Sequence, residues 1–350
     1  MEAHYCKYVL DFKNPSGTSR GILTTKESYF IIIRERERIG VGECGLLKGL
    51  SIDDVDDYED ILSEVCEQIS LGFNALKERY YRYPSIQFGL EQAFRSLDAR
   101  DPFLLFPSSF TGGHSSIPIN GLIWIGDEDF LYEQLEQKIA SGFQCIKMKV
   151  GALDFDTELR FIKTLRQRYS TNEVQLRLDA NGAFQPAEAL DKLKLLSQYE
   201  IHSIEQPVAQ GQLKIMTDLC RKSPIPIALD EELIGLFTVD KKRELLERVR
   251  PHYIILKPSL VGGFSGSQEW IDLAMELKIG WWITSALESN IGLNAIAQWT
   301  STLNTTMYQG LGTGGLYTNN FKSPLEIRQG MLYYDRGVEW SANLIHELCS

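Results

Sequence analysis

The sequence predicts an α/β fold, an eight-stranded (β/α) barrel with an α+β capping domain at its N-terminus. Three observations support this prediction: five short apolar stretches recur every 25 to 30 residues, strand and helix patterns alternate from residue 117 to residue 308, and strand patterns followed by helix patterns fill the preceding segment. Such an interval suits one strand, one helix and two loops, and repeated units of this kind favour a parallel sheet closed into a barrel. The 350 residues suffice for a barrel of about 250 residues and a smaller domain.

The capping domain is predicted at residues 1–112. One of its helices has an acidic first turn, which suits the helix dipole, and the other has apolar residues at helical spacing. Turn-forming residues within the strand region predict a mobile loop. The expected elements, in order, are strands within 5–43, the mobile loop at 14–21, helices at 53–72 and 85–100, and a linker at 102–113.

The barrel domain is predicted at residues 113–318. Its strands are expected near residues 119, 145, 174, 202, 225, 253, 281 and 306, with a helix after each. The tail, residues 319–350, is expected to return to the capping domain together with its apolar run at 331–334.

Composition and charge limit which partners and which cellular compartment we expect for this protein. The net charge of −11 comes without a basic stripe, which argues against a nucleic acid or an anionic membrane as the partner. Six cysteines form no C-x-x-C pair, so we expect reduced thiols and a cytoplasmic protein. The N-terminus has no apolar signal core, and no apolar run approaches the length of a membrane span. The sequence assigns no oligomeric state.

Ionisable residues end the five apolar stretches, which are 145–149, 175–179, 203–205, 227–230 and 253–257. Side chains alternate between the two faces of a strand, so Lys147 and Lys149 share one face and Met148 lies on the other. If the aliphatic face packs on helices, the charged face points into the barrel. Active sites of such barrels lie at the carboxyl ends of the strands, where these charges fall.

Asp179, Glu205 and Asp230 end three consecutive predicted strands. Three carboxylates so close together cannot all stay ionised without a cation. Ligands that offer only oxygen favour a hard divalent ion, Mg²⁺ first and Mn²⁺ second. The alternative is that each carboxylate forms a buried ion pair with one of the lysines.

Lys149 on the second strand and Lys257 on the sixth would approach the carboxylates from opposite sides. A buried lysine beside another cation loses proton affinity and becomes usable as a base near neutral pH. A metal and a lysine base together suit proton abstraction next to a carboxylate, because the cation stabilises the enediolate that develops.

Five motifs carry a resemblance to a known family: Lys147-Met-Lys149, Asp179-Ala-Asn181, Glu205-Gln-Pro207, Asp230-Glu231 and Lys257-Pro258-Ser259. As a set they resemble the two-lysine branch of the enolase superfamily, which includes muconate lactonizing enzymes, and the resemblance covers the whole chain. It implies a modified TIM barrel under a capping domain, with Mg²⁺ at the three carboxylates.

Four further stretches resemble one group of lyases within that branch: 18–21, 42–44 with 49–51, 120–126 and 310–317. The resemblance implies dehydration of the dicarboxylate 2-succinyl-6-hydroxy-2,4-cyclohexadiene-1-carboxylate to 2-succinylbenzoate, a step of menaquinone biosynthesis. Lys149 would remove the proton next to the ring carboxylate and then protonate the departing hydroxyl on the same face. Lys257 would face the other side of the ring as a cation over a π system.

Five residues complete the predicted site. Lys147 is expected to make the base easier to deprotonate and to touch the substrate carboxylate, and Asn181 to orient a metal-bound water. Ser285 is a candidate donor to the succinyl group, Gly312 brings backbone N–H groups near the ligand, and Arg20 could close over the substrate. The alternatives are turn chemistry for the serine, a tight loop for the glycine and simple solvation for the arginine.

Two other functions compete with this interpretation. A racemase or epimerase of N-acylated amino acids or dipeptides would use Lys149 and Lys257 as two bases on opposite faces. Dipeptide epimerases commonly have an acidic pair after the eighth strand, and the segment 310–315 has no acid. A barrel kept only as a scaffold would be expected to have lost at least one of the six ring residues, and all six are present.

Overall fold

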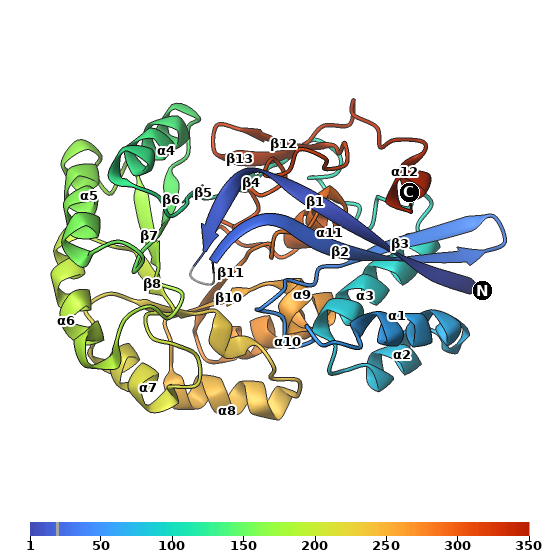
Figure 1. Cartoon of the computed structure of the whole chain (residues 1–350), viewed down its shortest axis with the longest axis horizontal. Coiled ribbons are helices and arrows are strands. Elements are labelled where there is room, and N and C mark those ends of the chain that lie inside the picture. Colours follow the sequence, from blue (N-terminus) through green and yellow to red (C-terminus); the bar gives the residue numbers. More distant parts are fainter. Residues whose placement is uncertain (19–20, 350) are drawn as a thin grey trace.

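The computed structural model describes residues 1–18 and 21–349, and it confirms the predicted fold class (Figure 1). The capping domain lies on the right of the picture in blue and cyan, and the helices of the barrel curve around the left edge. The capping sheet has the order β1 (Glu2–Thr18), β2 (Gly21–Glu35), β3 (Arg38–Cys44), and all its pairs are antiparallel. The helices that follow are α1 (Tyr58–Glu67), η1 (Ile69–Leu71), α2 (Phe73–Arg79) and α3 (Pro84–Asp98).

Strand β3 packs directly on helix α3, and glycine permits this close approach. A Cβ atom at Gly42 would lie 1.9 Å from the carbonyl oxygen of Gly89, so no side chain fits between strand and helix. The backbone N–H of Val41 also donates to Ser96 Oγ of α3, at 3.0 Å. The packing therefore holds the end of β3, with Glu43 and Cys44, in one place.

The prediction of a loop at 14–21 is wrong for the residues that the structure describes, because β1 continues to Thr18 and β2 begins at Gly21. The strand is held from outside the sheet: Phe12 pairs with Tyr317, and the N–H of Lys13 donates to the carbonyl of Leu316 at 2.8 Å. Residues 14–18 thus belong to the last part of a long strand that runs from the capping domain towards the barrel (Figure 1). Arg20 lies outside the described residues.

In the described part of the chain, the barrel sheet has seven parallel strands in the order β11-β10-β9-β8-β7-β6-β5. Their bounds are β5 (Gly121–Ile123), β6 (Cys145–Lys149), β7 (Gln175–Asp179), β8 (Ser203–Glu205), β9 (Ile227–Leu229), β10 (Tyr253–Leu256) and β11 (Gly280–Ile283). The eighth strand predicted near residue 306 is reduced to two parallel bridges, Gln309 with Ile119 and Gly310 with Thr284. These bridges join the two edges of the sheet and close the barrel.

The helices that follow the strands are α4 (Glu128–Ala140), α5 (Phe155–Arg168), α6 (Pro186–Leu196), α7 (Leu213–Lys222), α8 (Val239–Val249), α9 (Pro258–Val261), α10 (Gly263–Glu276) and α11 (Asn290–Thr300), with short turns η2 (Ser197–Tyr199) and η3 (Glu231–Leu233). The alternation predicted for β6 is confirmed. Ile146 and Met148 are fully buried in the core under the helices, whereas the side chains of Lys147 and Lys149 keep 12 and 14% of their surface exposed.

The tail divides between the two domains. Strand β13 (Met331–Tyr334) pairs with β12 (Leu325–Arg328) and with β4 (Ile117–Pro118), so the run 331–334 joins the start of the barrel and does not return to the capping domain as predicted. Asn319 Nδ2 donates to the carbonyl of Val9 in β1 at 2.8 Å, and helix α12 (Leu344–Leu348) packs near β1. The exact domain boundaries stay a prediction.

A disulfide connects Cys6 of β1 to Cys349, with Cα atoms 5.2 Å apart. The prediction that all six cysteines are reduced is therefore wrong for this pair, because the fold brings together residues that are 343 positions apart. The other cysteines, Cys44, Cys66, Cys145 and Cys220, are free and buried. No helix among the described residues is both long and apolar enough to cross a membrane.

A buried carboxyl group in the capping domain makes a testable contribution to stability. Asp53 is 1% exposed; one of its carboxyl oxygens accepts from the backbone N–H and the hydroxyl of Ser85, at 2.8 and 2.6 Å, and the other is buried without a partner among the described residues. Burial raises the pKa of Asp53 to about 6, and the hydrogen bonds from Ser85 offset burial only in part.

We expect Asp53→Asn to remove a pH-dependent cost. A carboxyl pKa that is higher in the folded state favours folding below the unfolded value near 3.8, and this contribution is lost as the pH rises through about 6. The variant should therefore gain up to about 3 kcal/mol relative to wild type between pH 4 and pH 7, at about 1.4 kcal/mol per pKa unit. Urea unfolding at both pH values measures the difference, and an equal difference at pH 4 and pH 7 would contradict the prediction.

Candidate active site

The structure brings the six predicted ring residues together at the carboxyl ends of neighbouring strands. Lys147 Nζ lies 2.9 Å from Asp179 Oδ2 and 2.5 Å from Glu205 Oε2, so one ammonium group contacts both carboxylates. Lys149 Nζ lies 2.7 Å from the same oxygen of Asp179. Lys257 forms an ion pair with Asp230, directly after β9. These contacts show that the six residues lie together, while their roles as bases and metal ligands stay predictions.

The order of the strands separates the two candidate bases. Asp179 ends β7 and stands opposite Glu205, which ends β8, while Asp230 follows the next strand. Lys149 pairs with the first carboxylate of this row and Lys257 with the last. The two ammonium groups therefore reach the row from its opposite ends, as the sequence predicted.

The carboxyl groups are almost completely buried, and burial affects them unequally. Burial pushes the pKa of Asp179 up, but the ammonium groups of Lys147 and Lys149 outweigh burial and hold it well below its usual range. Burial and repulsion from Asp179 raise the pKa of Glu205 well above its usual range. Burial and the neighbouring charges therefore shift the pKa values of these two carboxyl groups in opposite directions.

Lys147 and Lys257 hold their protons strongly. Burial lowers the pKa of Lys147, but attraction by Asp179 and Glu205 outweighs burial and leaves the pKa well above its usual range. The pKa of Lys257 is raised in the same way, chiefly by Asp230. At these two residues, direct contact with a carboxylate therefore outweighs burial; the weakened proton affinity predicted for a lysine base beside another cation stays a prediction.

Asn181 lies behind the cluster and contacts the candidate base directly. Its Oδ1 accepts from Lys149 Nζ at 2.5 Å, and its Nδ2 donates to Glu231 Oε1 at 2.9 Å. Asn181 adopts a left-handed backbone conformation with a φ of 41°, a region that asparagine tolerates better than most residues. The sequence pattern predicts no role for Glu231, although this residue follows Asp230 directly and belongs to the same motif.

A cavity lies above the cluster, and both domains line it. The three lysines, Asn181, Ser285 and Gly312 line it, and the roles predicted for them stay predictions. Ser285 Oγ lies 2.6 Å from Thr313 Oγ1, so this hydroxyl already has one partner. The capping domain contributes Leu23 from the hairpin and Lys48 from the loop after β3. Lys48 was missed, because a lone exposed lysine in a loop carries no signal in the sequence.

The chemistry of the donor set fits a divalent cation. Asp179, Glu205 and Asp230 offer only carboxylate oxygens, and Oε1 of Glu205 is buried without a hydrogen-bond partner among the described residues. In the described ranges, three candidate ligand atoms within 4.8 Å of one another occur at His4, Cys6 and Cys349, but the two sulfurs are joined in the disulfide. The Lys147 ammonium group lies between two of the barrel carboxylates.

Comparison with known proteins decides the family. Residues 131–339 match the family model described as enolase C-terminal domain-like. The o-succinylbenzoate synthase of Desulfotalea psychrophila is 43% identical over 95% of this chain and 98% of its own length. The chain belongs to the o-succinylbenzoate synthase family. The crystal structure of MenC from Desulfotalea psychrophila superposes with a TM-score of 0.85 at 41% identity, over 95% of this chain and 99% of that one.

Two epimerases are less similar in sequence to this member of the o-succinylbenzoate synthase family. The L-Ala-D/L-Glu epimerase of Bacillus subtilis is 23% identical over 95% of this chain and 89% of its own length. A dipeptide epimerase from Enterococcus faecalis, solved in complex with Mg and the dipeptide L-Leu-L-Tyr, shares the fold with a TM-score of 0.80 at 19% identity, over 95% of this chain and 96% of that one. These two similarities support the fold, but identities of 23 and 19% do not assign the activity.

Proposed function

We propose that the chain is an o-succinylbenzoate synthase, a hydro-lyase that converts 2-succinyl-6-hydroxy-2,4-cyclohexadiene-1-carboxylate and releases water and 2-succinylbenzoate in menaquinone biosynthesis. The observation that carries this proposal is the 43% identity to an o-succinylbenzoate synthase over nearly the full length of both chains. The complete ring of three lysines and three carboxylates below a shared cavity supports it.

Lys149 is the proposed general base and general acid. In its neutral form, its Nζ takes the proton from the ring carbon that bears the carboxylate, and the C–H electrons move onto the carboxylate, which becomes the enediolate; they return to the ring when the hydroxyl leaves. The same nitrogen then returns the proton to the departing hydroxyl, the C–O bond breaks, and water leaves as the ring becomes aromatic. One base can serve both steps because the proton and the hydroxyl leave from the same face.

Lys257 is proposed to face the other side of the substrate ring. Its ammonium group lies at the far end of the carboxylate row, where a positive charge stabilises the enediolate through electrostatic attraction and contact with the π system. Lys147, between Asp179 and Glu205, is proposed to contact the substrate carboxylate. Ser285 Oγ and the backbone at Gly312 are proposed to receive the succinyl group, because both line the cavity.

Asp179, Glu205 and Asp230 are the proposed ligands of Mg²⁺, with Mn²⁺ as the alternative ion. The bound ion would supply positive charge that stabilises the negative charge developing on the substrate carboxylate. The residues that would hold it also keep the lysines in register, because each carboxylate is in contact with at least one ammonium group.

The direct test is turnover of the cyclohexadiene substrate by purified protein. With Mg²⁺ present we expect loss of the diene absorbance, and with excess EDTA we expect that loss to stop and to resume when Mg²⁺ is restored. A parallel incubation of N-succinylated amino acids in D₂O measures exchange of the α-proton. Exchange without any turnover of the cyclohexadiene would indicate a racemase instead of a synthase. If neither reaction occurs, the scaffold alternative is favoured.

A further inference from the structure

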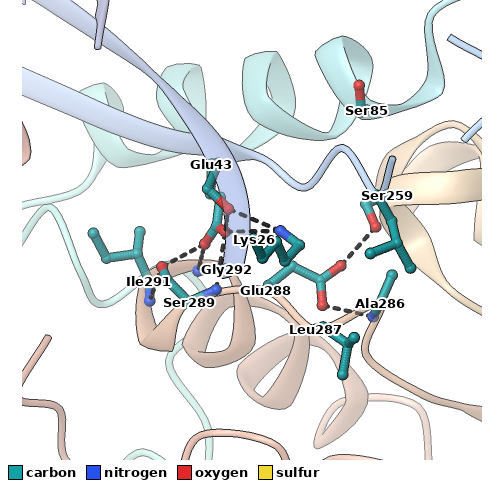
Figure 2. A network of polar contacts seen from close by, with 12 residues as sticks. Lys26, Glu43, Ser85, Ser259, Ala286, Leu287, Glu288, Ser289, Ile291 and Gly292 are labelled. Atoms are coloured by element: carbon teal, nitrogen blue, oxygen red, sulfur yellow. Dashed lines mark hydrogen bonds and ion pairs between the residues drawn. The ribbon is translucent and has the colours of Figure 1, made fainter. Parts of the chain in front are cut away.

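Two buried carboxylates of the capping domain contact the N-termini of two barrel helices. Glu43, near the end of β3, accepts from the backbone N–H groups of Ser289 and Gly292 at the start of α11, both at 2.9 Å, and from the Ser289 hydroxyl at 2.5 Å (Figure 2). Glu91 of α3 accepts from the backbone N–H groups of Phe264 and Ser265 at the start of α10. A negative charge at a helix N-terminus is stabilising, so both contacts fasten the capping domain to the barrel.

The Glu43 contact belongs to a polar network inside the interface. Lys26 of β2 is 4% exposed, and its Nζ donates to Ser28 Oγ at 2.8 Å and lies 3.9 Å from Glu43 Oε1. Ser28 Oγ in turn donates to Glu43 at 2.8 Å. Two neighbouring strands of the capping sheet therefore hold this carboxylate in one orientation, and Lys26 compensates part of its charge.

Glu288 precedes Ser289 and connects two segments of the barrel. Its Oε1 accepts from Ser259 Oγ at 2.6 Å, and its Oε2 accepts from the backbone N–H of Ala286 at 2.7 Å (Figure 2). Ser259 lies two residues after Lys257, and Ala286 follows Ser285. The side chain of Glu288 has no exposed surface, so it cannot touch a substrate in the cavity. It joins the segment that carries Lys257 to the segment that carries Ser285.

The loop after β3 packs against the same two residues. A Cβ atom at Gly45 would lie 2.9 Å from Ser259 Cβ and 3.0 Å from Glu288 Cγ, so the capping backbone approaches both side chains closely. Leu47, Lys48 and Leu50 line the cavity from this loop. The capping loop, the Lys257 segment and residues 285–289 therefore meet at one buried point.

We propose that Glu43 and Glu288 are positioning residues: Glu43 docks the capping domain on residues 285–289, and Glu288 transmits that placement to Ser285 and to the Lys257 segment. The expected changes in KM and kcat/KM rest on the proposed function. The expected changes in hydrogen exchange rest on the hydrogen bonds alone. Glu91 provides the comparison, because it docks the same domain on α10 and touches neither cavity segment.

The test compares Glu43→Gln and Glu288→Gln with Glu91→Gln in the full-length protein. Gln keeps the size of the side chain but turns an N–H group towards a donor that the carboxylate had accepted from. We expect KM for the cyclohexadiene substrate to rise about 10-fold and kcat/KM to fall about 10- to 100-fold in the first two variants, since a small misplacement of reacting groups can cost 100-fold. Glu91→Gln should lower the unfolding temperature and leave KM unchanged.

Hydrogen exchange measured by mass spectrometry gives a readout that needs no turnover. Glu43→Gln and Glu288→Gln should speed exchange in peptides that cover 285–292, while Glu91→Gln should speed it only around 264–265. If either of the first two variants fails to fold, Ser259→Ala removes one link of Glu288 and should raise KM in the same direction. A wild type without turnover would count against the proposed function alone. Equal KM and equal exchange at 285–292 in all the variants would overturn the positioning role.

Discussion

Replacing Lys149 with alanine is expected to lower kcat for the dehydration by about 10³- to 10⁴-fold, in the upper part of the roughly 10²- to 10⁴-fold range of a positioned general acid or base. The effect should be at the upper end because one nitrogen serves both proton transfers. Folding should survive the change, because Asp179 keeps its contact with Lys147 at 2.9 Å. Steady-state kinetics with the cyclohexadiene substrate measure the loss, and the unfolding temperature of the variant checks its fold.

Lys149→Arg is the matched control for charge. Arginine keeps a positive group beside Asp179 but stays protonated at any pH at which the protein is folded, so it cannot accept the substrate proton. We expect the arginine variant to be as slow as the alanine variant. If Lys149→Ala keeps more than about a tenth of the wild-type kcat, or if Lys149→Arg restores the rate, Lys149 acts through its charge and the proposed base must be sought elsewhere.

The second large effect is expected at the metal site. Glu205→Gln should weaken the apparent affinity for Mg²⁺ by more than about 100-fold, because losing a residue behind the ligands alone already costs 10- to 100-fold. A bound ion stabilises the folded state by mass action, so Mg²⁺ should raise the unfolding temperature of wild type and leave that of the variant unchanged. Titration of the unfolding temperature with MgCl₂ measures the affinity without any turnover.

Glu232→Gln controls for the loss of a buried carboxylate near the ring. Glu232 accepts from the backbone N–H of Gly211 at 2.9 Å and has no ion pair with the ring lysines among the described residues. The control variant should keep the Mg²⁺-dependent rise in unfolding temperature. A wild-type protein that shows no such rise would favour the alternative in which the carboxylates only form ion pairs with Lys147, Lys149 and Lys257.

The proximity of the charged residues could be predicted from the sequence, because they recur at regular intervals along the chain. Parallel strands in a barrel all present their carboxyl ends at one rim, so an ionisable residue at the end of each apolar stretch must arrive at the same place. This rule predicted the contacts among Lys147, Asp179 and Glu205, and the alternation along β6 predicted which side chains face inward. Neither inference needed a contact between distant segments, since the repeated unit carries the geometry.

The sequence by itself therefore determined the barrel class, the inward face of its strands and the six charged residues at its rim. All three follow from local periodicity. Only the tertiary structure decided how the two domains meet. Glu43 and Ser289 are 246 positions apart and Cys6 and Cys349 are 343 apart, and no pattern along the chain links either pair. Hydrogen bonds and disulfides of this kind depend on the distance in space between two surfaces, and that distance exists only once both domains have folded and docked.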